Sequence, residues 1–238
     1  MSRHPTHPPP RQPRTAPPSP SPSPSPAPPP SLPLPPPAAL ALGGSVAARR
    51  AGSDDGRVNA SPAWAYEKVE LVRYDPRWPE VAARELARVN AALGPWLAAP
   101  AEHVGSTSIP GLAAKPVIDL MAAVRDLDAV IVTIVAELDR VGWVQVPPEL
   151  DTGASWRRFF VLPDAAGRRR VAHLHVMSPE QPRWQELPAF RDALRADAAL
   201  ARSYEAHKRR LAAKFADDRE AYTAAKSSFV AHVLRATG

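Results

Sequence analysis

The chain has no cysteine, no long apolar run and few aromatic residues. The absence of cysteine from its 238 residues excludes disulfides, thiolate chemistry and cysteine-rich zinc sites. No apolar run reaches the roughly 18 residues that a membrane span needs. The short apolar run at 38–48 follows a proline-rich stretch instead of a basic segment, and this order argues against a secretory signal. The sequence therefore predicts a cytoplasmic protein with no membrane partner.

Proline, by contrast, is abundant, and it divides the chain in two. Residues 1–60 hold 18 of the 31 prolines, with a Ser-Pro repeat and almost no aromatic side chains. Such a composition buries too little apolar surface to offset the entropy of ordering. Residues 1–62 are therefore expected to be a disordered segment with polyproline II bias, and a misplaced translation start is the alternative explanation of this leader. Residues 63–238 contain all six tryptophans and are expected to form one domain.

The formal net charge of +6 belongs mostly to the proline-rich leader. Residues 1–60 carry six arginines and two acids, which leaves 24 basic and 22 acidic residues for the rest of the chain. No base-reading motif or stacking platform accompanies this small excess, so we do not expect nucleic acid as a partner. A protein partner for the leader, of the SH3 type, stays open.

The most informative stretch is a small-residue loop followed by an apolar segment with one acid, His103 to Leu120. Gly105 and Ser106 let backbone amides approach a phosphate where a Cβ would block it. The strand expected at 116–124 places Asp119 on one face and its apolar neighbours on the other. A carboxylate opposite a buried strand face is costly unless it is solvated, paired or bound to a metal. The pattern therefore indicates a site for phosphate and metal.

A second pair of strands repeats this alternation. Segments 157–162 and 170–177 are separated by a Pro-Asp-Ala-Ala-Gly turn, which is typical of a hairpin. In the second segment, His173 and His175 share one face and alternate with apolar residues. If the apolar residues are buried, both histidines lie on the face that is expected to hold Asp119.

Helix signals flank these strands. Asp75-Pro76 is expected to begin one helix, and Asp126 or Asp128 to cap another. Two or three helices follow between about 182 and 236. Strands packed with helices on one side predict an α+β domain.

These residues resemble the GrpB family, a branch of the nucleotidyltransferase-like superfamily. The resemblance covers roughly Glu67 to the C-terminus. It includes the His103–Leu120 run, the segments Arg157–Phe160 and His173–Val176, and a helical tail with tyrosines and lysines at family-like spacing. The resemblance implies an α+β fold with a nucleotidyltransferase-like mixed sheet, helices packed on one side and a C-terminal helical segment. It also implies a metal-dependent transferase that acts on a nucleotide or another phosphorylated small molecule, with Mg²⁺ or Mn²⁺ as its divalent metal.

The resemblance also suggests a role for individual residues. Asp119 and His175 are expected to be catalytic, and Asp119, His173 and His175 to hold the metal. The residues expected to bind phosphate or nucleotide are Gly105, Ser106, Thr107, Lys115, Arg158, Lys208 and Lys226. Structural alternatives stand beside these roles: Asp119 bracing the loop at 105–107, histidines satisfied within a cleft, and lysines in solvent. Strand alternation sends only one of Arg157 and Arg158 inward.

One departure from the superfamily pattern favours an alternative function. Active members carry acid-x-acid on the strand that here reads Asp119-Leu120-Met121, and the next strand offers histidines in place of a third acid. One aspartate and two histidines suit Mg²⁺ poorly and Mn²⁺ or Zn²⁺ better. The alternative is a non-catalytic domain that binds a nucleotide or phosphorylated metabolite and is linked to coenzyme A metabolism. Family members also occur fused to dephospho-CoA kinase, but this chain has no Gly-x₄-Gly-Lys-Ser/Thr loop, so we expect no such kinase activity.

Overall fold

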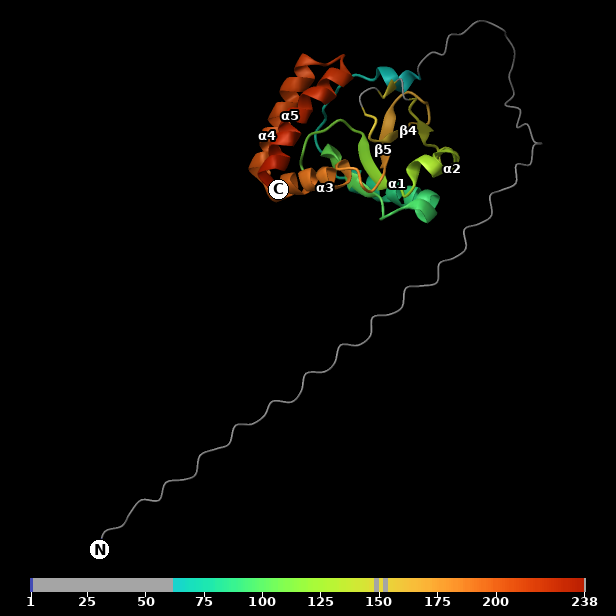
Figure 1. The fold of residues 1–238 in the computed structure, drawn as a ribbon. Helices are drawn as coiled ribbons and strands as arrows, with labels where there is room; N and C mark the ends of the chain where they lie inside the picture. Colours follow the sequence, from blue (N-terminus) through green and yellow to red (C-terminus); the bar gives the residue numbers. More distant parts are fainter. Residues whose placement is uncertain (2–61, 148–149, 152–153, 238) are drawn as a thin grey trace, which may run out of the picture. The chain divides into compact units, whose positions relative to one another are not determined.

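The structure of the protein is a computed structural model that describes residue 1 and residues 62–147, 150–151 and 154–237 (Figure 1). The disorder expected for residues 1–62 therefore falls almost wholly outside the described residues. In chain order, the helices and strands of the described part are η1 (Ala63–Tyr66), α1 (Trp78–Leu93), η2 (Gly94–Trp96), β1 (Glu102–Val104), η3 (Ser106–Ser108), β2 (Ile118–Ala123), α2 (Leu127–Arg140), β3 (Val144–Gln145), β4 (Arg158–Pro163), β5 (Arg170–Met177), α3 (Arg183–Ala196), α4 (Ala198–Lys214) and α5 (Arg219–Thr237).

Within the described residues the strands form one mixed sheet in the order β1-β2-β5-β4-β3. β2 and β5 are parallel, and the other neighbouring pairs are antiparallel. Parallel neighbours need a long crossover connection, which here includes α2, β3 and β4. The predicted hairpin is confirmed as β4 and β5, and the α+β class with a mixed sheet is confirmed as well.

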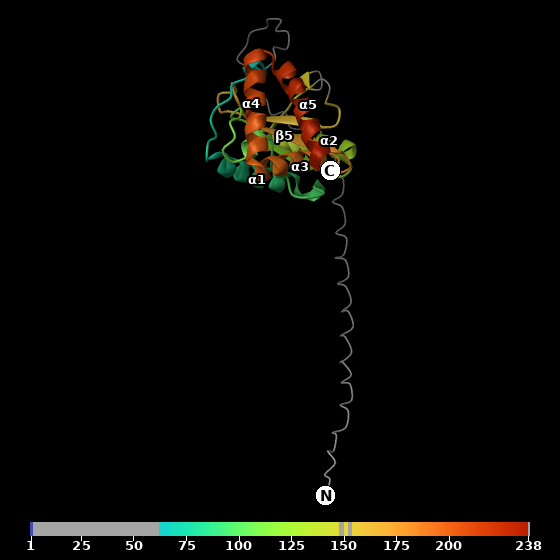
Figure 2. The same cartoon turned by 90° about the vertical axis from the view of Figure 1, so that its left-hand side faces the viewer.

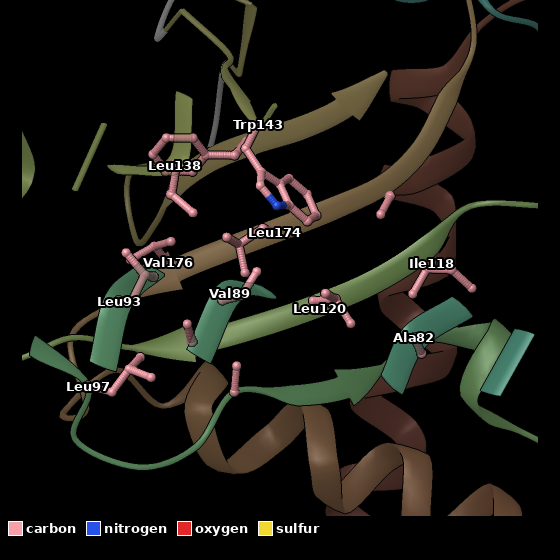
Figure 3. Packing of buried hydrophobic residues seen from close by; sticks show 14 of the residues in the cluster. Ala82, Val89, Leu93, Leu97, Ile118, Leu120, Leu138, Trp143, Leu174 and Val176 are labelled. Carbon is pink, nitrogen blue, oxygen red and sulfur yellow. The ribbon is translucent and has the colours of Figure 1, made fainter. Parts of the chain in front are cut away.

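The apolar face of the sheet packs against α1 and α2. Alternate residues of β2 and β5 point to this side, as a period of two requires, and Figure 3 shows Leu120, Leu174 and Val176 packed with residues of α1 and α2. The fully buried members of this core include Val89 and Leu93 of α1, Leu120 of β2, Ile134 and Leu138 of α2, and Leu174 and Val176 of β5. The predicted sorting of strand faces is thus confirmed, and it leaves Asp119 and both histidines on the opposite face.

The three C-terminal helices form a second layer on that opposite side. Phe190, Leu194, Tyr204 and Val233 make a cluster of buried residues with the loop that follows η3. Figure 2, seen from this side, shows α4 and α5 next to each other in front of β5. The predicted C-terminal helical segment is confirmed. The loop between β1 and β2 therefore lies between the sheet and these helices.

Helix starts differ from the sequence expectation in detail. α1 begins at Trp78 and not at Pro76, because the Asp75 carboxylate accepts a hydrogen bond from the Arg77 amide and forms a turn ahead of the helix. Pro79 then occupies the first helical turn, where its missing N–H leaves no hydrogen bond unmade. Asp126 is at the N-cap of α2 as expected, but its side chain makes no capping hydrogen bond. Among the described residues, no helix combines the length and apolarity that crossing a membrane would take.

Candidate functional site

The open face of the sheet brings one acid and two histidines together at its centre. Asp119 lies beside His173 in the parallel register of β2 and β5, and His175 lies beside Met121. His173 Nδ1 is 2.9 Å from Asp119 Oδ1, and His175 Nε2 is 3.9 Å from the same oxygen. The three residues are the one group of potential metal ligands found in the described part of the chain, with ligand atoms within 4.8 Å of one another. The cluster predicted from strand alternation therefore exists.

Gly105 closes one side of this cluster. Its backbone has φ +69° and ψ −171°, a conformation found essentially only in glycine. A Cβ at this position would lie 2.4 Å from Asp119 Oδ2, so glycine is required twice, by the backbone angles and by the neighbouring carboxylate. The turn that continues into η3 is thereby fixed directly against Asp119.

Two arginines flank the histidines on their far side. Arg157 Nη1 is 2.5 Å from His175 Nδ1, and Arg170 Nη1 is 3.5 Å from His173 Nε2. Arg157 is itself fixed by two hydrogen bonds to the carboxylate of Asp151. Its guanidinium also lies 4.0 Å from the centre of the Phe159 ring. Each imidazole is therefore held between a guanidinium and the same carboxylate.

The protonation of the cluster follows from burial and these contacts. Burial favours the neutral form of Asp119, but the hydrogen bonds from His173 and His175, with their electrostatic attraction, outweigh it and hold the carboxyl pKa well below its ordinary value. Burial lowers the pKa of His173 to about 3, against the opposing effect of Asp119, and it also lowers the pKa of His175. At neutral pH the centre consequently holds an ionised carboxylate between two neutral imidazoles.

Lysines predicted to bind phosphate approach this centre from the loop and from the C-terminal helices. Lys208 of α4 is 1% exposed and donates a hydrogen bond to the carbonyl of Ala113. Lys115 and Lys226 lie 5.8 and 4.6 Å from the ring centre of Tyr222. Burial, followed by the charge of Lys226, lowers the pKa values of Lys115 and Lys208 to about 7, and burial also lowers the pKa of Lys226. The three ammonium groups therefore share one crowded, electropositive region.

A cavity of about 200 Å³ extends from this region. Its lining includes Lys115, Arg170, His173 and Arg219, with Glu67 among the acids. Burial, then the charge of Arg219, lowers the pKa of Arg170 to about 9. Nη1 of Arg219 is buried and has no hydrogen-bond partner in the part of the chain that the structure describes. Buried guanidinium nitrogens are rarely left without an acceptor, so the cavity is suited to an anion.

Two of the predicted phosphate-binding residues face elsewhere. Thr107 is 1% exposed, and its hydroxyl lies between His103 Nε2 and the carbonyl of Val117, so it organises the turn. Arg158 belongs to the apolar face of β4 and reaches round to pair with Asp128 at the start of α2. The structure brings Arg157 to the centre in its place, as one of the two choices left by strand alternation.

Arg170 and Arg219 were not predicted as site residues. Alternation places Arg170 with the core-facing residues of β5, yet its guanidinium turns back to the carbonyl of Trp64 and to His173. Arg219 is the first residue of α5 and is far in sequence from the strands. No local pattern marks either arginine, since both depend on how distant segments pack.

Comparison with known proteins gives a family and a fold. Residues 68–236 match the family model described as GrpB protein. The UPF0157 protein BH1888 of Halalkalibacterium halodurans is 38% identical over 169 residues, which is 70% of this chain and 81% of that protein. The UPF0157 protein YqkA of Bacillus subtilis is 33% identical over 68% of this chain but only 45% of its own length. This chain thus spans less than half of YqkA.

A solved structure extends the likeness to three dimensions. The conserved protein GrpB from Enterococcus faecalis superposes with a TM-score of 0.60 at 28% identity, over 71% of this chain and 96% of that one. A protein named dephospho-CoA kinase in Mycolicibacterium paratuberculosis is 30% identical over 70% of this chain and 45% of that protein. The RNA terminal uridylyl transferase Cid1 has a TM-score of only 0.41 at 15% identity, over 61% of this chain and 44% of that one, a likeness too weak to support a function. The family match over residues 68–236 includes the residues at the centre of the sheet, and the superposition supports the same relationship. The chain belongs to the GrpB family.

Proposed function

We propose that this domain binds a nucleotide or another phosphorylated small molecule in the cavity beside the Asp119 centre, which is lined by the loop at 115–117, the start of β5 and the first residue of α5. The observation that supports it most directly is the group of basic side chains that line the cavity, among which Nη1 of Arg219 is buried and has no acceptor in the described part of the chain. The charge of Lys226 helps to lower the pKa of Lys115, and an anion that arrives beside these ammonium groups stabilises their charged forms.

In this proposal the phosphate groups of the ligand contact the three lysines and the two cavity arginines, Arg170 and Arg219. Lys115 is close enough to Asp119, Lys226, Arg170 and Arg219 for each to shift its pKa, so it lies between the Asp119 centre and the cavity. A ligand with two or more phosphates would meet Lys226 and Lys208 on one side of Lys115 and the arginines on the other. The Gly105–Ser106 backbone is proposed to lie along the same ligand, beside Asp119.

The second candidate is metal-dependent nucleotidyl transfer, which the Gly105 turn against Asp119 favours. Its chemistry would require oxygen ligands for the metal, and the strand offers a buried methionine, Met121, two residues after Asp119. The surrounding side chains are mainly cations, which repel a divalent ion. Binding without transfer is therefore the function that the geometry supports best, and a link to coenzyme A metabolism would come through the ligand or a partner.

Thermal unfolding with and without ligand tests the proposal. ATP, UTP, pyrophosphate, dephospho-CoA and inorganic phosphate are added in EDTA, and separately with Mg²⁺ or Mn²⁺. A ligand at a hundredfold excess over its Kd stabilises the folded state by about 2.7 kcal/mol. For a domain of this size that corresponds to a rise in Tm of roughly 5 to 10 °C.

Matched variants on α4 locate the binding. Lys208→Met removes a buried ammonium, whereas Lys214→Met removes an exposed one at the end of the same helix. The rise in Tm should persist in Lys214→Met and shrink in Lys208→Met. If no phosphorylated compound raises the Tm, or both variants respond like the wild type, the proposal is wrong. Release of pyrophosphate from ATP only with Mn²⁺ or Mg²⁺ would instead support the transferase.

A further inference from the structure

The hydrogen-bond partners of the two histidines determine where their protons are. A guanidinium has only donors and a carboxylate only acceptors. His175 Nδ1 faces Arg157 at 2.5 Å, so this nitrogen must be the acceptor, and the proton of the neutral ring is on Nε2. His173 Nδ1 faces Asp119 at 2.9 Å, so it carries the proton, while Nε2 faces Arg170. The two rings are therefore opposite tautomers, and each directs its N–H toward Asp119.

This arrangement conflicts with the divalent metal that the family resemblance implies. A metal ligand must offer a lone pair, but the nitrogens nearest Asp119 carry protons. To free a lone pair there, the proton of His175 would have to move to Nδ1, directly against the N–H of Arg157. Two imidazole N–H groups also occupy the side of Oδ1 that a cation would need, at 2.9 and 3.9 Å. The donor set as arranged does not fit a divalent ion.

Several contacts fix the guanidinium of Arg157 beside Nδ1 of His175. Asp151 accepts two of its hydrogen bonds, at 3.0 and 2.5 Å, and both side chains are only 14% exposed. The guanidinium is flanked by Phe159 at 4.0 Å and Trp156 at 5.0 Å. Arg170 is likewise buried, donating to the carbonyl of Trp64 at 3.2 Å. Neither arginine rotates away without loss of these contacts.

We infer that the Asp119 centre is a metal-free hydrogen-bonded site, in which Arg157 and Arg170 are positioning residues that act through His175 and His173 to exclude divalent cations. The inference does not rest on the proposed ligand. It assigns the two arginines a function that composition and motif do not suggest. The carboxylate is then a fixed negative charge among cations, oriented by two N–H donors.

Nitrogen-resolved NMR of the wild-type full chain tests the tautomers directly. Two-bond ¹H–¹⁵N spectra at pH 7.5 distinguish a protonated ring nitrogen from a bare one. The expected result is a bare Nδ1 in His175 and a bare Nε2 in His173, assigned by loss of each signal in His175→Gln and His173→Gln. A protonated Nδ1 in His175, or two rings of the same tautomer, would overturn the inference. The result of this measurement does not depend on the binding of a metal or a ligand.

Metal titrations test the exclusion itself. Zn²⁺ and Mn²⁺ are added without any phosphorylated compound, and binding by the wild type and by Asp119→Asn should be the same, because histidines elsewhere in the chain are common to both. Arg157→Met releases Nδ1 of His175 and should bind Zn²⁺ about 10- to 100-fold more tightly than the wild type, the size of the effect that a hydrogen-bond partner has on a ligating histidine. Asp119→Asn in the Arg157→Met background should abolish this gain. Arg158→Met is the matched control, since its side chain pairs with Asp128 on the other face.

Two outcomes would contradict the inference. One equivalent of Zn²⁺ or Mn²⁺ bound by the wild type and lost in Asp119→Asn would mean that the centre accepts a metal. Equal Zn²⁺ affinities for Arg157→Met and Arg158→Met would mean that Arg157 does not exclude the metal from the Asp119 centre. An NMR spectrum of Arg157→Met accompanies the titration. It must show that the variant is folded and that Nδ1 of His175 can now carry the proton.

Discussion

Replacing Gly105 by alanine should disturb both the fold and the centre, and the structure allows the two effects to be separated. The backbone conformation at Gly105 costs a residue with a Cβ about 1 to 3 kcal/mol. The added carbon would also lie 2.4 Å from Asp119 Oδ2 and 2.8 Å from its Cβ. Asp119 must then shift and weaken its hydrogen bond to His173, a loss of about 1 kcal/mol. Gly105→Ala should therefore lower the Tm by roughly 5 to 15 °C.

Gly111→Ala is the matched control for backbone strain alone. Gly111 has φ +77°, and a Cβ there would have no atom within 4 Å. Its cost should be limited to about 1 to 2 kcal/mol, and the His173 N–H signal should not move. Thermal unfolding followed by circular dichroism, with NMR of His173 in both variants, measures the difference. If both variants melt together and both leave the His173 signal unchanged, the close approach of Gly105 to Asp119 does not exist in solution.

Five further predictions concern charge, chemistry and the leader. Because burial lowers the pKa of Lys115 and Lys208 to about 7, ATP affinity in EDTA should fall from pH 7 to 9 by up to about tenfold per pH unit for each lysine; a flat calorimetric profile would contradict this. The stability of the unliganded protein should change in the opposite direction. The unfolded chain keeps the protons of both lysines up to about pH 10.5, whereas the folded chain loses them above about pH 7, so the free energy of unfolding measured with denaturant should rise from pH 7 to 10.5. Asp119→Asn should raise ATP affinity in EDTA, since it removes the negative charge beside the lysines, and a fall would indicate that the carboxylate contacts the ligand. ATP with dephospho-CoA should give no phosphorylated product by mass spectrometry, and turnover abolished by a substitution in this domain would refute that expectation. A chain beginning at Ser61 should keep the Tm of the full chain, and a marked loss would show that the leader packs on the domain.

The parts of the fold that follow a local period were predictable from the sequence. Alternation along β2 and β5 separated Asp119, His173 and His175 from their apolar neighbours, and each face is where the period of two placed it. The loop of small residues at Gly105 was likewise visible in the sequence, although its positive φ was not predicted. These features depend on a few consecutive residues, so a single sequence contains them.

The remainder of the site depends on contacts between distant segments. Alternation left Arg157 and Arg158 as alternatives, and only the packing of β4 against β5 puts the first beside His175. Arg219 reaches the cavity because α5 folds back over the sheet. Thr107 was expected to face a phosphate, but its hydroxyl is turned toward His103 by the tight η3 turn. No window of neighbouring residues contains that information.

The parallel pairing of β2 with β5 has a consequence for the order in which the domain assembles. His173, His175 and Arg157 lie on or next to one local hairpin, whereas Asp119 is 54 residues from His173 along the chain. Local pairings close faster than distant ones, so the hairpin can form while its carboxylate is still absent. In such an intermediate the imidazoles would be open to water and would titrate near their ordinary range. A signal from the His173 ring during refolding would therefore mark the moment when the central sheet closes.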